Sequence, residues 1–553
     1  MPLVRGFLSS LSRALHLTAP VQESTTSKTT IDQEDLFRYT SGRWLIDEKY
    51  QQEQRFVRFN VENLCSQAAA QFDEQTTCVR IIKREGNFNK AFLLTMNNGN
   101  EVIAKIPCPN AGPAALTTAS EVATLEFLRS YTSIPVPKVL AWSCDSANPV
   151  GAEYIIMEKV PGVALAEKWD GMSALQRYKL IDRIVEMEKE LSKLELPAYG
   201  SLFFRDSRNL LPKLLPLPSD LDAAGLFGIG PSCNRSVWHN NFDRSGPMPY
   251  VGPWNSFAEF AMSIPQRELA FIDRSPDEVE DQLLRSGTAQ SVNEYSDLLW
   301  KAAEILPVLA RDPLIAKGAR PVLWHTDLHL GNIFVSPDDP TTVEGIIDWQ
   351  STQAAPLFIQ ARFPEFLQPP KNYKPGTQVP QLPDDFDSLG PEQKDQATKD
   401  QALASQSKYY EMCCLGYNKP VYTAMQLDRR LWEPFTCCQL FANGNLVPLR
   451  NALLCLSQDW AVLELPGSCP FVFNKEDLKR HNEQAAEFQD RLYLWDIAKT
   501  QLCTDDTGWV PMERWEATNE MNRHLFDMYI QTMSEELLPE VAATKWPFPI
   551  MSS

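Results

Sequence analysis

The chain has 553 residues, of which 44% are hydrophobic, 10% aromatic and 22% charged, and this composition excludes a largely disordered or collagen-like protein. Its formal net charge of −19 disfavours a nucleic-acid-binding protein, because such a surface needs clustered positive charge. No stretch of about 18 or more apolar residues occurs, so the sequence predicts a soluble protein without a transmembrane segment.

The N-terminal segment differs from the rest of this acidic chain. It contains Arg5 and Arg13 but no acidic residue before Glu23. On a helical wheel its apolar residues share one face, and its basic and serine residues share the other. This pattern is typical of a mitochondrial transit peptide, and the alternative is a tail that lacks acidic residues by chance. We therefore expect residues 1–30 to be a transit peptide or a disordered segment, and the protein to lie in the mitochondrion.

Residues 35–160 predict a small lobe of short strands around one helix. Turn sequences at 85–89 and 97–100 separate the first three strands, which is typical of an antiparallel meander. Ser120 precedes the apolar residues of the helix, which covers about three turns and ends before Pro135. The predicted strands cover residues 80–83, 91–95, 101–106 and 154–157.

Residues 161–540 predict a larger, mainly helical lobe. Its first helix starts at a capping box formed by Ser173 and Gln176. The stretches 203–255 and 364–405 have compositions typical of loops or insertions. The fold class is therefore α+β, with a small sheet-rich lobe followed by a large helical lobe. Further helical patterns cover residues 291–311, 401–432, 475–500 and 511–536.

Two polar clusters between apolar strands indicate the chemistry. Phosphoryl transfer from ATP needs one carboxylate near the acceptor hydroxyl, plus an amide oxygen and a second carboxylate that hold Mg²⁺. Asp327, Asn332 and Asp348 supply these three groups. The spacing from His325 through Asp327 to Asn332 matches the catalytic loop of protein kinases, and Asp348 matches their metal-binding aspartate. The alternative is a solvated turn between two strands.

A zinc site formed by His325, Asp327 and His329 is a second alternative, because residues at i, i+2 and i+4 share one face of a strand. It leaves Asn332 and Asp348 unused, and the chain has only six histidines. We therefore favour the phosphotransfer site and expect His329 to be a hydrogen-bonding loop residue.

A site of this type also needs a strand lysine at the phosphates and a helix carboxylate that fixes it. Lys105 lies within the apolar strand 101–106, a poor place for an ammonium group unless an anion meets it. On the following helix Glu121 shares the apolar face with Leu125, whereas Glu126 points away. The sequence therefore predicts a pair between Lys105 and Glu121, and the alternative for Lys105 is a solvent-exposed strand edge.

The nucleotide contacts are less marked in the sequence. The turn that contains Gly86 and Asn89 lies between two strands, where backbone N–H groups can cradle phosphate oxygens. With a single glycine it also fits an ordinary hairpin turn. Glu158 and Val160 follow the strand at 154–157, in the position of a hinge whose backbone binds adenine. The predicted cofactors are ATP and Mg²⁺.

Taken together, these motifs resemble the aminoglycoside phosphotransferase/choline kinase-like family. The resemblance rests on residues 86–90, Lys105, 120–124, 134–139, 325–332 and 347–350. Motifs similar to a fungal mitochondrial branch of the family lie at 37–44, 229–231, 252–254 and 506–511. The resemblance covers about residues 35–540, and it implies a two-lobed protein-kinase-like fold with ATP in the cleft.

The resemblance also implies roles for the site residues. Asp327 would be the base, and His325 would position the catalytic loop. Asn332 and Asp348 would bind Mg²⁺, and Lys105 would bind the phosphates. Family members that phosphorylate antibiotics or choline present acidic or aromatic residues to a cationic substrate, and no such constellation aligns here. The acceptor and the oligomeric state stay open.

The leading hypothesis is an ATP- and Mg²⁺-dependent phosphotransferase that acts on a hydroxyl of a small molecule. The alternative is a catalytically silent kinase-like protein that binds nucleotide or regulates other proteins. A protein kinase activity is disfavoured because no Ala-Pro-Glu element follows Asp348.

Overall fold

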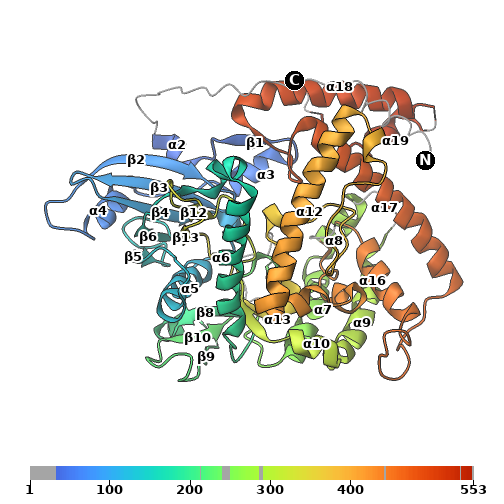
Figure 1. Ribbon diagram of the computed structural model, residues 1–553, viewed down its shortest axis with the longest axis horizontal. Helices are drawn as coiled ribbons and strands as arrows, with labels where there is room; N and C mark the ends of the chain where they lie inside the picture. Colours follow the sequence, from blue (N-terminus) through green and yellow to red (C-terminus); the bar gives the residue numbers. More distant parts are fainter. Residues whose placement is uncertain are drawn as a thin grey trace.

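The computed structural model describes residues 33–211, 213–238, 249–285, 290–440, 444–535 and 537–550. Within them the chain forms a small lobe, built on a sheet at the left of Figure 1, and a large lobe of helices at the right. The predicted α+β fold class with two protein-kinase-like lobes is confirmed. The predicted transit peptide, residues 1–30, lies outside the described residues. No helix among the described parts of the chain is both long and apolar enough to span a bilayer.

Five antiparallel strands form the sheet of the small lobe, in the order β2-β3-β4-β6-β5. Their registers agree with the predicted meander, since Ala91 lies opposite Lys105, which in turn lies opposite Ile155. The strands are β2 (Cys78–Glu85), β3 (Asn89–Met96), β4 (Glu101–Pro107), β5 (Val139–Ser143) and β6 (Tyr154–Glu158).

Helices cover both faces of this sheet. The predicted helix is α5 (Leu116–Tyr131), and its Val122 packs with Ile155 on the face that carries Lys105. On the other face, Phe92 packs with Leu64. The prediction of a single helix in this lobe is wrong, because the additional helices are too short to give a clear helical period. They are α2 (Gln33–Phe37), α3 (Glu48–Glu53) and α4 (Val61–Ala69).

The large lobe begins with α6 (Ala174–Lys193), whose predicted capping box of Ser173 and Gln176 is present. Helix α6 packs against α12 (Pro391–Tyr417), and α7 (Phe257–Arg274) packs against α9 (Val292–Leu309). The remaining helices are α8 (Pro276–Arg285), α10 (Pro313–Gly318), α11 (Leu357–Gln360), α13 (Lys419–Met425), α14 (Arg429–Trp432), α16 (Val447–Gln458), α17 (Lys475–Leu502), α18 (Trp515–Met533) and α19 (Pro539–Ala543).

Short strands in this lobe hold the loops of the candidate site. Strand β12 pairs with β13 and β7, and β11 pairs with β14. The catalytic-loop motif therefore runs from the end of β11 to the start of β12. The strands are β7 (Val163–Ala164), β11 (Pro321–Leu323), β12 (Ile333–Val335), β13 (Val343–Ile346) and β14 (Ala354–Pro356).

Both stretches predicted as loops contain regular structure, which corrects that prediction. The first holds most of a three-stranded antiparallel sheet of β8 (Ser201–Phe204), β10 (Phe227–Gly230) and β9 (Leu215–Pro216). Strands of two to four residues are too short to show an alternating pattern. The second stretch contains the start of α12, whose first buried residue is Ala404. An exposed helical segment lacks the apolar periodicity on which a sequence prediction depends.

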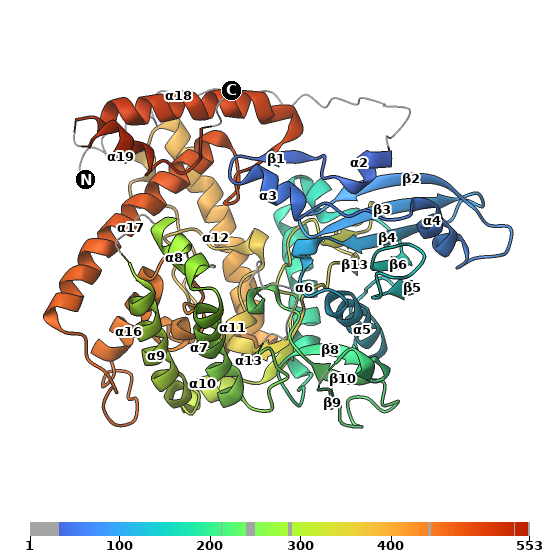
Figure 2. The same cartoon turned by 180° about the vertical axis from the view of Figure 1, so that it is seen from behind.

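The two ends of the described chain meet beside the small lobe. Strand β1 (Gly42–Trp44) pairs antiparallel with β15 (Trp509–Pro511). The Arg43 guanidinium stacks over the Trp515 ring at 4.2 Å, and Figures 1 and 2 both show β1 next to α18. We call residues 35–44 and 509–515 the terminal clasp.

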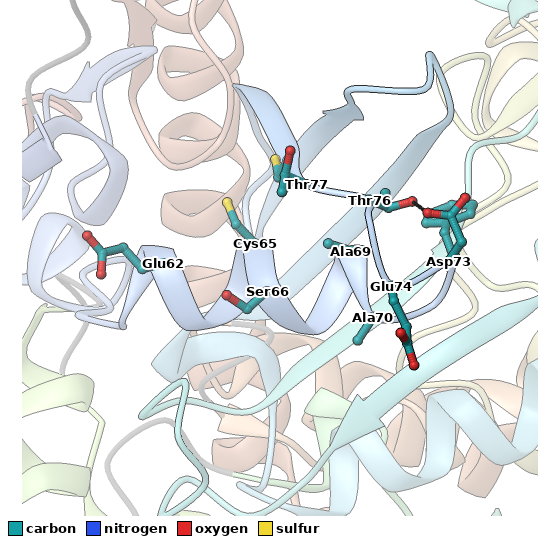
Figure 3. A pocket seen from close by; sticks show the side chains of 11 residues that line it. Glu62, Cys65, Ser66, Ala69, Ala70, Asp73, Glu74, Thr76 and Thr77 are labelled. Carbon is teal, nitrogen blue, oxygen red and sulfur yellow. Dashed lines mark hydrogen bonds between the residues drawn. The ribbon is translucent and has the colours of Figure 1, made fainter.

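A hollow of about 630 Å³ lies between α4 and the start of β2 (Figure 3). Cys65 and Thr77 point into it from the helix and the strand side, and the Thr76 hydroxyl donates to Asp73 over 2.8 Å. None of the predicted site residues lines this hollow. The candidate site therefore lies elsewhere, at the junction of the two lobes.

Candidate active site

Lys105 is held between carboxylates of both lobes. Its Nζ lies 2.6 and 2.9 Å from the two Glu121 carboxylate oxygens, and 2.7 Å from Asp348 Oδ1. Burial disfavours the ammonium, but the Asp348 and Glu121 carboxylates outweigh it and raise the pKa of Lys105. Burial likewise opposes the charge of Asp348, yet Lys105 lowers the pKa of that carboxyl. The predicted pairing of Lys105 with Glu121 is thus present, and Asp348 joins it.

The catalytic-loop motif is tied to the segment that carries Asp348. Asn332 Nδ2 donates to the Asp327 carbonyl over 3.0 Å, and the Ile347 N–H donates to the Asn332 carbonyl over 3.0 Å. The Asp327 side chain is exposed in the cleft. Asp348 has φ 62°, a left-handed conformation that costs a non-glycine residue about 1–2 kcal/mol. Such strain is common at functional sites.

His325 links the same two segments from the buried side. Its Nε2 lies 2.9 Å from the Ile347 carbonyl oxygen, and its ring packs edge-on against Trp349 at 4.7 Å. Burial lowers the pKa of His325, which favours the neutral imidazole. His329 Nδ1 accepts the Gly331 N–H over 3.0 Å. Because both imidazoles bind backbone groups, the arrangement favours a positioning role for His325 over the zinc alternative.

Asp348 and Asn332 each keep one side-chain oxygen of the kind that can bind a magnesium ion. Asp348 uses Oδ1 for Lys105, and Asn332 uses its amide nitrogen for Asp327. Among the described residues, Asp348 Oδ2 and Asn332 Oδ1 have no hydrogen-bond partner. Carboxylate and amide oxygens are the ligands that Mg²⁺ prefers, and Mg²⁺ completes its shell with water and phosphate oxygens.

The predicted phosphate turn takes part in a contact between the lobes. Gly86 donates its N–H to the Asn89 carbonyl over 3.1 Å, which closes the turn between β2 and β3. The side-chain amides of Asn89 and Gln350 form two hydrogen bonds with each other. Gln350 Nε2 donates to Asn89 Oδ1 over 2.8 Å, and Asn89 Nδ2 donates to Gln350 Oε1 over 3.1 Å. The Asn89 side chain thus connects the lobes, and the atoms left for a phosphate in this turn are backbone groups.

The two predicted hinge residues, Glu158 and Val160, contact residues at β5 and in β13. The Glu158 N–H donates to the Lys138 carbonyl over 2.9 Å. The Val160 side chain is buried next to Gly345, where an added Cβ would lie 2.5 Å from Val160 Cγ1. The Glu158 side chain is exposed and accepts the Lys138 N–H over 3.4 Å, whereas the Val160 side chain serves packing, so an adenine contact from Val160 would come from its backbone.

One residue of the cleft, Arg235, was not predicted. It opens the short 3₁₀ helix η5 (Arg235–Val237) in the first irregular stretch. Its guanidinium carbon lies 3.6 Å from the centroid of the Phe88 ring, which belongs to the phosphate turn. Its Nη1 also lies 3.2 Å from Ser351 Oγ. The neighbouring motif at 229–231 was the one sequence signal close to it.

Comparisons with known proteins identify families and relatives that are similar to this chain. Residues 82–359, which contain Lys105 and Asp348, match the model of the phosphotransferase enzyme family. A subtelomeric hrmA-associated cluster protein of Aspergillus fumigatus is 30% identical, over 86% of this chain and 97% of the relative.

A relative in Eremothecium gossypii, named altered inheritance of mitochondria protein 9, mitochondrial, is 24% identical over 87% of this chain and 88% of its own length. The predicted mitochondrial location agrees with that name. A solved ternary complex of an aminoglycoside phosphotransferase with AMP-PNP and hygromycin B is 12% identical, covers 70% of this chain and 94% of its own, and has a TM-score of 0.34.

Proposed function

This chain belongs to the phosphotransferase enzyme family, and from this premise we propose that it transfers the terminal phosphoryl group of ATP to a hydroxyl of a small molecule in mitochondria. The observation that carries the proposal is the contact of Lys105 with Glu121 and Asp348 across the cleft. A lysine fixed in this way is the group that such enzymes use to align phosphates.

Each site residue has a defined task in this proposal. Asp327 accepts the proton of the acceptor hydroxyl as the oxygen attacks the phosphorus atom. Lys105 donates to the phosphate oxygens, and Glu121 holds its ammonium in place. Asp348 and Asn332 would hold Mg²⁺, which when bound neutralises the charge that develops on the transferring group.

Charge supports this assignment. Lys105 carries one positive charge between two carboxylates, so the group has one surplus negative charge where Asp348 meets the cleft. A divalent cation at Asp348 would offset that surplus and attract the nucleotide phosphates. His325 keeps Asp348 in its strained conformation through the Ile347 carbonyl, which preorganises the site before ligands bind.

The test is ATP turnover against a panel of alcohols that carry cationic, neutral or anionic groups. The full chain with ATP and Mg²⁺ should form ADP faster with at least one of them. Asp327→Asn should lower that rate by roughly 10²–10⁴-fold and leave AMP-PNP affinity nearly unchanged, because it removes only the base. If AMP-PNP binds but no alcohol gives more ADP with the wild type than with Asp327→Asn, the chain binds nucleotide without transferring phosphate.

A further inference from the structure

A polar cavity of about 400 Å³ connects Asp327 with Arg235. Asn87 and Phe88 of the phosphate turn line it, as does His329 of the catalytic loop. A cavity of this size suits a small molecule. The inference that follows rests on the proposed function, in which Asp327 activates the acceptor and this cavity holds it. The other lining residues are Asn234, Thr326 and Ser351.

Arg235 brings an unpaired positive charge to this cavity. Among the described residues, no carboxylate oxygen lies within 4.0 Å of its guanidinium nitrogens. Burial lowers the pKa of Arg235, and Asp348 and Asp327 counteract this from a greater distance. An arginine nevertheless stays charged in a protein. A largely buried guanidinium without an anion is costly, so a ligand that supplies the anion is favoured.

The Arg235 nitrogens that make no hydrogen bond are arranged to bind an anion. Its Nη1 interacts with Ser351 Oγ at 3.2 Å and with Gln350 Oε1 at 3.5 Å. Among the described residues, Nε and Nη2 have no hydrogen-bond partner. A guanidinium with two free nitrogens can bind a carboxylate or phosphate through two parallel hydrogen bonds.

The backbone that carries Arg235 is fixed in the large lobe. The buried Ser232 hydroxyl donates to Gln353 Oε1 over 2.5 Å, and the Cys233 N–H donates to Ser201 Oγ over 2.9 Å. The Asn234 side chain accepts the Ser236 N–H over 3.0 Å and starts the turn. With its backbone fixed and its side chain stacked on Phe88, Arg235 is ordered before a ligand binds, which lowers the entropic cost of binding.

We propose that Arg235 determines acceptor specificity by binding an anionic group, a carboxylate or a phosphate ester, of the acceptor alcohol. The acceptor is then an acid that carries a hydroxyl group. Its anionic group lies at Arg235 and its hydroxyl at Asp327, the two charged residues that line the cavity.

Inorganic phosphate is the probe for this site, measured by calorimetry on the full chain saturated with Mg²⁺ and AMP-PNP. The saturating nucleotide occupies its own phosphate sites, so added phosphate reports on the acceptor cavity. Wild type should bind phosphate, and Arg235→Gln should bind it at least about tenfold more weakly, because it loses a charged hydrogen-bond donor. AMP-PNP affinity should be the same in both proteins.

The matched control is Arg205→Gln, an arginine of the same irregular stretch that donates to the Gly225 carbonyl. It should bind phosphate as wild type does, and the melting temperatures of both variants show whether they fold. Equal phosphate binding by Arg235→Gln and wild type, or none by wild type, overturns the inference. So does a matching loss of AMP-PNP affinity in Arg235→Gln, which would assign Arg235 to the nucleotide. If wild type fails to bind AMP-PNP at all, the proposed function itself fails.

Discussion

The cleft and the part of the sheet that contacts the terminal clasp contain opposite versions of one charge group. In the cleft, Lys105 lies between the carboxylates of Glu121 and Asp348. In the clasp region, Glu85 lies between two lysines, 2.8 Å from Lys83 Nζ and 3.9 Å from Lys90 Nζ. The first group has one surplus negative charge, and the second has one surplus positive charge.

The two groups differ in whether the surrounding protein compensates their surplus charge. Glu85 accepts the backbone N–H groups of Thr40 and Ser41 over 2.8 and 2.7 Å, and Lys83 and Lys90 both donate to the Arg38 carbonyl. All charges of that group are therefore enclosed by protein. In the cleft, the Asp348 side chain is 34% exposed, whereas that of Glu85 is 2% exposed. A closed charge group stabilises the fold, and an open one can bind a ligand.

The largest effect on stability should come from the closed group. Glu85→Gln keeps the side-chain volume but leaves Lys83 and Lys90 without a carboxylate. We expect it to lower the free energy of unfolding by about 3–5 kcal/mol, the cost of an uncompensated buried charge. Urea denaturation measures this, and the exposed Glu62→Gln is the control, with a change of about 0.5 kcal/mol or less. A loss as small as that of the control would show that the charges of Lys83, Glu85 and Lys90 are not coupled.

The contrast between these groups also shows what a sequence can predict. Lys105 and Glu121 were predictable because a lysine in an apolar strand and a carboxylate on an apolar helix face are local patterns. The pairing of β1 with β15 was not, because strands of three residues from opposite ends of the chain show no periodicity. Arg235 was missed for a related reason, since only the folded insertion brings it to Phe88.

The buried carboxylate of Glu188, on α6, has no lysine partner in the part of the chain that the structure describes, and it extends the comparison. Burial raises its pKa to about 8, and the Tyr410 hydroxyl donates to it over 2.7 Å. The unfolded chain loses this proton near pH 4.3, so the stability of wild type should fall from about pH 4.3 to pH 8 and then level off.

Glu188→Gln removes this titration while it keeps the shape of the side chain. Relative to wild type, it should gain about 3–4 kcal/mol in unfolding free energy between pH 5 and pH 8, since most of the pKa difference between about 8 and 4.3 is titrated in this range and one pKa unit corresponds to about 1.4 kcal/mol. Urea denaturation across this pH range measures the difference. If the difference in unfolding free energy between the two proteins does not change with pH, the Glu188 carboxyl is not neutral in the folded protein.

The smallest stability effect should come from the open group. In Mg²⁺-free buffer, Asp348→Asn leaves Lys105 paired with Glu121 and removes the surplus negative charge. We expect the unfolding free energy to change by less than about 1 kcal/mol, because no buried charge is left without a partner. Urea denaturation of this variant and of Glu85→Gln under the same conditions compares the two groups directly. Equal losses of unfolding free energy in the two variants would contradict the distinction between closed and open groups.

The most direct test of the account is the Mg²⁺ dependence of nucleotide binding at Asp348. Thermal denaturation of the full chain is measured with AMP-PNP, with and without Mg²⁺, for wild type and Asp348→Asn. At one hundred times its dissociation constant, a ligand adds about 2.7 kcal/mol of stability. Wild type should gain this stability only when Mg²⁺ is present, and Asp348→Asn should not gain it. An equal gain in both proteins, or no gain in wild type, would contradict a magnesium-dependent nucleotide site in this cleft.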